Sequence, residues 1–131
     1  MWKKEKCMKP RSKNVETGRR GEEVAAEWLV RRGFRVLERN WRCGHKEVDL
    51  VVESERAVHI VEVKTLTPPL QALPAEKVDA RKRARLVAAA RRLIAERHIE
   101  REVQFDVVAV ILGGDEPKVD YIPEAFYPIF Y

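Results

Sequence analysis

The pattern of apolar and polar residues along the chain predicts two helices. Apolar side chains recur at three- and four-residue spacing between about Val15 and Arg32, which is the period of a helix buried along one side. Gly33 is a suitable stop for this helix. A second helix is expected from about Ala75 to Arg97, with one apolar side and one strongly cationic side. Both segments are therefore expected to pack one side on a sheet.

Shorter runs rich in Val and Ile predict the strands, which are expected at 34–37, 47–53, 57–64, 103–112 and 118–122. The run 103–112 is the most continuously apolar, so we expect a central strand covered on both faces. Residues 40–46 contain a glycine and 67–76 contain three prolines, so both are expected as turn or loop. The order α-β-β-β-α-β-β predicts an α/β fold, a mixed β-sheet flanked by helices.

Length and composition indicate one domain at 15–131, preceded by a flexible basic arm at 1–14. Cys7 and Cys43 form no CxxC pattern, which argues against a zinc site or a disulfide framework. No apolar run approaches the ~20 residues that span a bilayer, and the N-terminus lacks the apolar segment of a secretory signal. We therefore expect a cytoplasmic protein without a membrane partner.

The charge balance points to a polyanionic partner. The net charge is +5 and the sequence pI is about 9.4. Basic residues concentrate in the N-terminal arm and in two helical segments, which makes nucleic acid the expected partner. The candidate contacts in these two segments are Arg19, Arg20, Lys82, Arg83 and Arg85.

Two neighbouring strands carry charged residues at matching positions. Glu62 and Lys64 are two residues apart in an apolar strand, so their side chains point to the same face. If 47–53 and 57–64 form a hairpin with a two- or four-residue loop, Asp49 lies directly opposite Glu62. A loop of three or five residues would place these carboxylates on opposite faces. The turn residues do not decide between these registers.

Opposed carboxylates repel unless a cation lies between them, and a divalent metal is the obvious candidate. Asp49 and Glu62, with the main-chain carbonyl of Val63, would hold Mg²⁺ or Mn²⁺. The metal would lower the pKa of a bound water, and Lys64 would orient that water or neutralise a phosphate. The alternative is a solvated charged face with a weak ion pair.

Several segments together resemble a known family. The stretch "RRGEEVAAEWLVRRGFRVLERNWR", the strands "EVDLVV" and "IVEVKT", and the helix "RKRARLVAAARRLI" are similar to the YraN family of bacterial predicted endonucleases. The hairpin with Asp49 and "EVK" at 62–64 resembles the PD-(D/E)xK core of restriction endonucleases and Holliday-junction resolvases. The resemblance covers roughly 15–127 and implies a restriction-endonuclease-like fold.

The resemblance also implies roles for further residues. The family's "GE" falls on Gly21 and Glu22, which makes Glu22 a candidate third metal ligand; a favourable charge near a helix start is the alternative. The family's lysine on the second helix falls on Lys82, a candidate phosphate contact. The family commonly has a basic residue soon after "EVK", whereas "TLT" stands here at 65–67.

These observations predict a metal-dependent endonuclease acting on nucleic acid, specifically on structured or branched DNA. The alternative is a nucleic-acid-binding module that keeps the nuclease fold with little turnover, and a third possibility is a structural protein. Resolvase-like enzymes act as dimers, and the aromatic segment 125–131 is a candidate homodimer patch; packing over its own sheet is the alternative.

Overall fold

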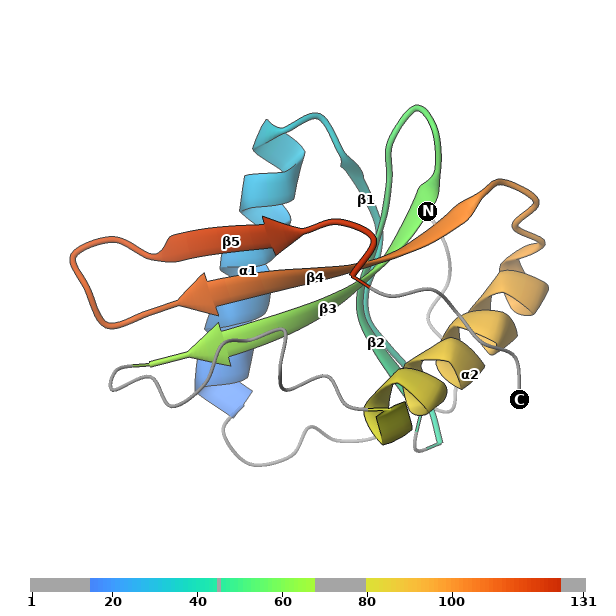
Figure 1. The fold of residues 1–131 in the computed structure, drawn as a ribbon, viewed down its shortest axis with the longest axis horizontal. Coiled ribbons are helices and arrows are strands. Elements are labelled where there is room, and N and C mark those ends of the chain that lie inside the picture. The colour runs from blue at the N-terminus through green and yellow to red at the C-terminus, as the bar shows by residue number, and fades with distance from the viewer. Residues whose placement is uncertain (1–14, 45, 68–79, 126–131) are drawn as a thin grey trace.

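A computed structural model of the chain describes residues 15–44, 46–67 and 80–125 (Figure 1). The elements are α1 (Val15–Arg31), β1 (Arg35–Cys43), β2 (Lys46–Glu53), β3 (Val58–Leu66), α2 (Ala80–Arg97), β4 (Val103–Ile111) and β5 (Lys118–Ile122). The expected basic arm, the proline-containing loop and the aromatic segment beyond residue 125 lie outside the described residues. Neither of the described helices is long and apolar enough to cross a membrane.

The strands form one open, mixed sheet in the order β1-β2-β3-β4-β5. Strands β3 and β4 run parallel, and the other neighbouring pairs are antiparallel. The parallel pair needs a crossover connection, and α2 lies in that connection. The predicted α/β class, with a mixed sheet and the order α-β-β-β-α-β-β, is therefore confirmed.

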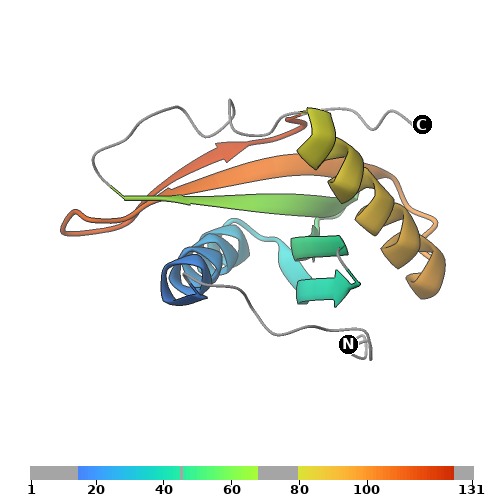
Figure 2. The ribbon, with the colours of Figure 1, turned by 90° about the horizontal axis from the view of Figure 1, so that it is seen from below.

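Each helix covers its own face of the sheet, so the described residues form two apolar clusters. Helix α1 packs on β3 and β4, as Figure 2 shows, and its Ala25, Ala26 and Leu29 are fully buried. Helix α2 packs over β2, where Leu86 and Leu93 contribute to the second cluster. This double coverage explains why β4 is apolar on both faces, as the sequence predicted.

The β2–β3 hairpin has the register on which the predicted site depends. Leu50 pairs with Val61 and Glu53 with Val58, so continuing the same register places Asp49 opposite Glu62. The paired region ends at Leu50 and Val61. Beyond it the two strands separate, and the gap is available to the Asp49 and Glu62 side chains.

The expectation of a turn at 40–46 was wrong for most of that segment, because β1 continues to Cys43. Trp41 pairs with Val48 and Cys43 with Lys46, and both Trp41 and Cys43 are buried. These residues alternate with polar ones at the period of a strand, a signal that the nearby glycine obscured. Gly44, with a φ of 65°, follows directly after the strand.

A buried polar chain lies at the opposite end of the hairpin. His59 is 4% exposed; its Nδ1 lies 2.7 Å from Asp106 Oδ2 and its Nε2 lies 2.9 Å from Ser54 Oγ. The order of contacts is that of a Ser-His-Asp triad. However, the Ser54 hydroxyl also accepts the backbone N–H groups of Arg56 and Ala57, each at 3.3 Å. The hydroxyl is thus committed to the hairpin turn, and the chain of contacts is structural.

Asp106 is fully buried, and its hydrogen bonds connect several elements. It accepts from the Tyr121 hydroxyl (2.7 Å), the Gln104 amide (2.9 Å) and the backbone N–H of Glu124 (2.9 Å), besides its contact with His59. Burial raises the pKa of Asp106, but these hydrogen bonds more than offset that effect and hold the pKa below its usual range. The ionised carboxylate therefore ties β3, β4 and β5 together.

We expect Asp106→Ala to lower the free energy of unfolding by about 3–5 kcal/mol at neutral pH, since it strands several buried donors. Because the folded-state pKa is depressed, the contribution of Asp106 is present above the unfolded value of about 3.9 and is lost as pH falls through the folded value. Urea unfolding from neutral pH downward should therefore show the two proteins converging in acid. The exposed Asp115→Ala should stay within about 0.5 kcal/mol of the parent; a comparable loss in both would contradict the prediction.

Candidate functional site

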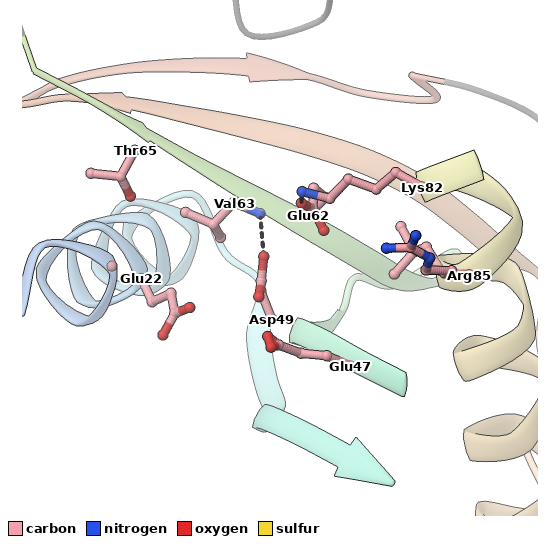
Figure 3. A pocket seen from close by; sticks show the side chains of 10 residues that line it. Glu22, Glu47, Asp49, Glu62, Val63, Thr65, Lys82 and Arg85 are labelled. Atoms are coloured by element: carbon pink, nitrogen blue, oxygen red, sulfur yellow. Dashed lines mark hydrogen bonds and ion pairs between the residues drawn. The ribbon is translucent and has the colours of Figure 1, made fainter. Parts of the chain in front are cut away.

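A pocket of about 280 Å³ opens where β2 separates from β3, between the N-terminal parts of α1 and α2 (Figure 3). Strands β2 and β3 and both helices contribute to its wall. Its charged lining consists of Glu22, Glu47, Asp49, Glu62, Lys82 and Arg85. Residues far apart in the sequence, and of both charges, thus converge on one small volume.

Asp49 is buried and hydrogen-bonded to the backbone of the neighbouring strand. It is 9% exposed, and its Oδ2 accepts the backbone N–H of Val63 at 2.9 Å (Figure 3). Burial raises the pKa of Asp49 well above its usual range, and the nearby Glu62 carboxylate raises it further. The N–H and C=O of a strand residue point to the same side, so the Val63 carbonyl also faces this edge of β3. Because burial and Glu62 both disfavour the ionised form of Asp49, a cation bound here would stabilise the Asp49 carboxylate.

Glu62 is held by two ammonium groups. Its Oε2 lies 3.3 Å from Nζ of Lys64 in the same strand and 2.6 Å from Nζ of Lys82 in α2. Burial lowers the pKa of Lys64, and the neighbouring Lys82 lowers it further. Burial also lowers the pKa of Lys82, but Glu62 more than offsets this and the pKa is raised overall. The pKa values of the two lysines are thus shifted in opposite directions, although both ammonium groups contact the Glu62 carboxylate.

Glu22 comes from the second turn of α1 and points into the same pocket (Figure 3). Its charge contributes to the raised pKa of Asp49. Within residues 15–44, 46–67 and 80–125, no three carboxylate, imidazole or thiolate groups are close enough together to hold a metal ion. Glu22, Asp49 and Glu62 thus line one pocket without forming a compact cluster, and in this conformation Glu62 contacts Lys64 and Lys82.

The donor chemistry of the pocket suits a hard divalent cation. Mg²⁺ and Mn²⁺ prefer carboxylate and carbonyl oxygens, which Asp49, Glu62, Glu22 and the Val63 main chain could supply. The adverse charge on the buried Asp49 is the feature that such an ion would relieve. Glu47 forms an ion pair with Arg42 of β1 at 3.4 Å and is partly exposed.

The predicted nucleic-acid contacts fall into two groups. Lys82 and Arg85 line the carboxylate pocket, whereas Arg83 is exposed on α2 and is not part of this lining. Arg19 and Arg20 are exposed near the start of α1 and line a second pocket of about 380 Å³. Cationic side chains therefore occur on α2 and on the first turns of α1.

Sequence reasoning did not identify two features of the structure. The first feature is Gly21, which is buried against the Thr65 side chain, so that α1 contacts the end of β3. The spacing of residues in the sequence does not predict this contact. The second feature is His59, to which the sequence analysis gave no role and which is part of the polar chain through Asp106. A histidine within an apolar strand was the available signal for the second feature.

The fold and pocket together define a mixed-sheet α/β domain with a carboxylate–lysine pocket at the point where two strands part. The model of the uncharacterised protein family UPF0102 matches residues 21–110. The chain belongs to the UPF0102 family, and the YraN assignment made from the sequence is thereby confirmed.

Relatives in this family match most of the chain. A UPF0102 protein of Anaeromyxobacter dehalogenans is 44% identical over 110 residues, covering 83% of this chain and 82% of its own. A UPF0102 protein of Bacteroides thetaiotaomicron is 42% identical over 113 residues, covering 86% and 93% respectively. A third, of Syntrophotalea carbinolica, is 40% identical and covers 86% and 92%. The similarity to these relatives therefore extends over more than four fifths of this chain.

Proposed function

We propose that this protein is a divalent-metal-dependent endonuclease that hydrolyses phosphodiester bonds in nucleic acid, specifically in structured or branched DNA. The observation that supports this best is the meeting of Asp49 and Glu62 in one pocket, with Lys64 beside Glu62. Carboxylates with an adjacent ammonium are the groups that metal-assisted phosphodiester hydrolysis requires. The family resemblance to the PD-(D/E)xK core adds to this proposal.

Each residue has a distinct role in the proposed reaction. Asp49, Glu62 and the Val63 carbonyl, with Glu22, would hold the metal. When bound, Mg²⁺ or Mn²⁺ would supply an activated water and stabilise charge on the transferring phosphate. Lys64 would orient the attacking water or help to neutralise the phosphate oxygens. The backbone N–H of Val63 donates a hydrogen bond to Oδ2 of Asp49 and so fixes this carboxylate, which lines the pocket.

Lys82 has a different part from Lys64. Its ammonium is 2.6 Å from Glu62 and 40% of its side chain is exposed, so it can exchange this carboxylate for a phosphate at the pocket mouth. Arg85 beside it and Arg19 and Arg20 on α1 would contact neighbouring phosphates. The net charge of +5 agrees with such a surface.

Two measurements test the proposal directly. Calorimetric titration with Mg²⁺ and with Mn²⁺ should show binding that Asp49→Asn removes. Labelled four-way, flap, single-stranded and duplex DNA should then be incubated with protein and each metal. Cleavage of at least one substrate, dependent on metal and on Asp49, supports the proposal; binding without cleavage on the whole panel contradicts it.

One observation favours the second candidate, a nucleic-acid-binding module with little turnover. Glu62 is already neutralised by Lys64 and Lys82, so the pocket is electrostatically stable around that group without a metal. A module of this kind would bind DNA equally well with and without Mg²⁺. It would also give a flat metal titration, which separates it from the enzyme.

We expect DNA affinity to depend steeply on salt, through the cations of α2. Replacing Lys82, Arg83 and Arg85 by Ala should reduce the slope of log affinity against log salt by up to about 3 on duplex DNA, because each lost phosphate contact removes about 0.9. Fluorescence anisotropy at several salt concentrations measures this slope. The matched control replaces three exposed cations outside the carboxylate pocket, Arg31, Arg56 and Lys118. Equal slopes for the two triple variants would show that α2 faces away from the DNA.

A further inference from the structure

We infer that Gly21 and Thr65 form a positioning contact that sets how far Glu22 reaches into the metal pocket. The inference rests on the proposed function and adds two residues to it, neither of which supplies a ligand. Each is the sequence neighbour of a site residue, since Gly21 precedes Glu22 in α1 and Thr65 follows Lys64 in β3. The tertiary structure brings Gly21 and Thr65 into contact.

The contact leaves no room for a side chain at residue 21. A Cβ built on Gly21 would lie 2.9 Å from Thr65 Cβ and 3.0 Å from Thr65 Cγ2, and nearer still to Thr65 Oγ1. Ordinary carbon contacts lie at about 3.5–4.0 Å. The backbone φ of Gly21 is not positive, so this position requires glycine for space and not for backbone conformation. The helix backbone therefore lies directly against the end of β3.

This close approach determines where the next residue points. Gly21 faces Thr65, and Glu22, one position further around the helix, enters the pocket that Asp49 and Glu62 line (Figure 3). A helix displaced outward to accommodate a methyl group would carry the Glu22 carboxylate with it. Metal–ligand distances in protein sites lie within about 0.2 Å of their standard values. The Gly21–Thr65 contact therefore decides whether Glu22 can join the ligand set.

Gly18 provides the internal comparison. It lies one turn earlier on α1 and also lines the pocket, yet a Cβ on Gly18 would meet nothing within 4 Å. Alanine at residue 18 would raise helix propensity without moving the helix. The two glycines therefore separate an effect of helix position from an effect of glycine replacement itself.

The test compares Mg²⁺ and Mn²⁺ affinity by calorimetry in the complete chain, without nucleic acid. Gly21→Ala should weaken metal binding by about 10–100-fold, the range found when a group that orients a ligand is altered. Gly18→Ala should bind as the parent does. Glu22→Gln alone should lower the metal affinity of the parent protein. Added to Gly21→Ala, it should lower the metal affinity no further.

A compensating substitution separates positioning from general damage. Thr65→Gly removes the three atoms that lie nearest to the new Cβ, so the double variant Gly21→Ala, Thr65→Gly should recover metal affinity. Circular dichroism and urea unfolding of each variant report the fold independently. If Gly21→Ala alone does not fold, the double variant and Glu22→Gln still decide the question.

The outcomes distinguish this inference from the proposed function. Parent protein that binds metal, with unchanged affinity in Gly21→Ala or in Glu22→Gln, overturns the positioning contact and leaves the endonuclease proposal standing. Failure of Thr65→Gly to restore affinity in a folded double variant also overturns it. A flat titration with the parent protein removes the proposed function, and this inference falls with it.

Discussion

Asp49→Asn is expected to abolish metal-dependent cleavage, with a fall of about 10³-fold or more. The substitution removes a metal ligand, and metal-ion stabilisation of a transferring phosphate is worth several kcal/mol. The amide oxygen can still accept the Val63 N–H, so the local structure should persist. Stability without metal should be unchanged or slightly higher, because the charge opposed by burial and by Glu62 has gone.

Glu62→Gln should abolish cleavage equally, with the opposite effect on stability. Glu62 is the counter-ion of Lys64 and Lys82, so its neutralisation leaves two ammonium groups facing one another. We expect a loss of about 1 kcal/mol or more in urea unfolding without metal. The sequence pattern alone, which indicates two opposed carboxylates, predicts that removing either charge raises stability slightly or leaves it unchanged.

The matched control is Glu27→Gln, which removes an exposed carboxylate of α1 outside the pocket lining. Its cleavage and stability should equal those of the parent. Assays use whichever DNA substrate the parent cuts, with both Mg²⁺ and Mn²⁺. Residual activity in Asp49→Asn comparable with that of Glu27→Gln would show that the pocket is not the active site.

The second large effect concerns Lys64, for which we expect Lys64→Met to lower turnover by about 10²–10³-fold. The loss of one donor aimed at a developing anionic charge costs this much in preorganised sites. Metal affinity should remain or rise, because the ammonium that competes for Glu62 has been removed. Lys64→Arg should also lose turnover while it keeps DNA affinity, since a planar fork replaces a compact ammonium.

Lys82→Met is the informative comparison, because Lys82 contacts the same oxygen of Glu62 from another element. Its main effects should be tighter metal binding and weaker DNA binding. Single-turnover rates at saturating DNA separate these contributions from the chemical step. Full turnover in Lys64→Met at saturating metal would remove Lys64 from the mechanism and leave it as a partner of Glu62.

The sequence by itself was sufficient for the element order and the sheet class. The three- and four-residue period of α1 and the apolar run of β4 both reflect burial, because the buried positions are occupied by apolar residues. The end of β1 was predicted wrongly, because Gly44 and the polar residues around Trp41 looked like a turn. Pairing with β2 and burial of Trp41 extended the strand against that local signal.

The candidate carboxylates were accessible from the sequence because a hairpin is local. Once β2 and β3 pair through a loop with an even number of residues, the alternation of side chains between the two sheet faces places Asp49 and Glu62 on the same face. The choice of register was not local. Turn residues left it open, and the packing of both apolar faces between α1 and α2 supports the one observed.

What only the tertiary structure decided was the arrangement around those carboxylates. Lys82 reaches Glu62 from a helix that lies in the crossover after β3, and Gly21 meets Thr65 where α1 lies against the end of that strand. Neither contact follows from spacing, because each depends on how closely a helix approaches the sheet. Residue type along the chain therefore determined which groups were present, while helix packing determined which of them meet.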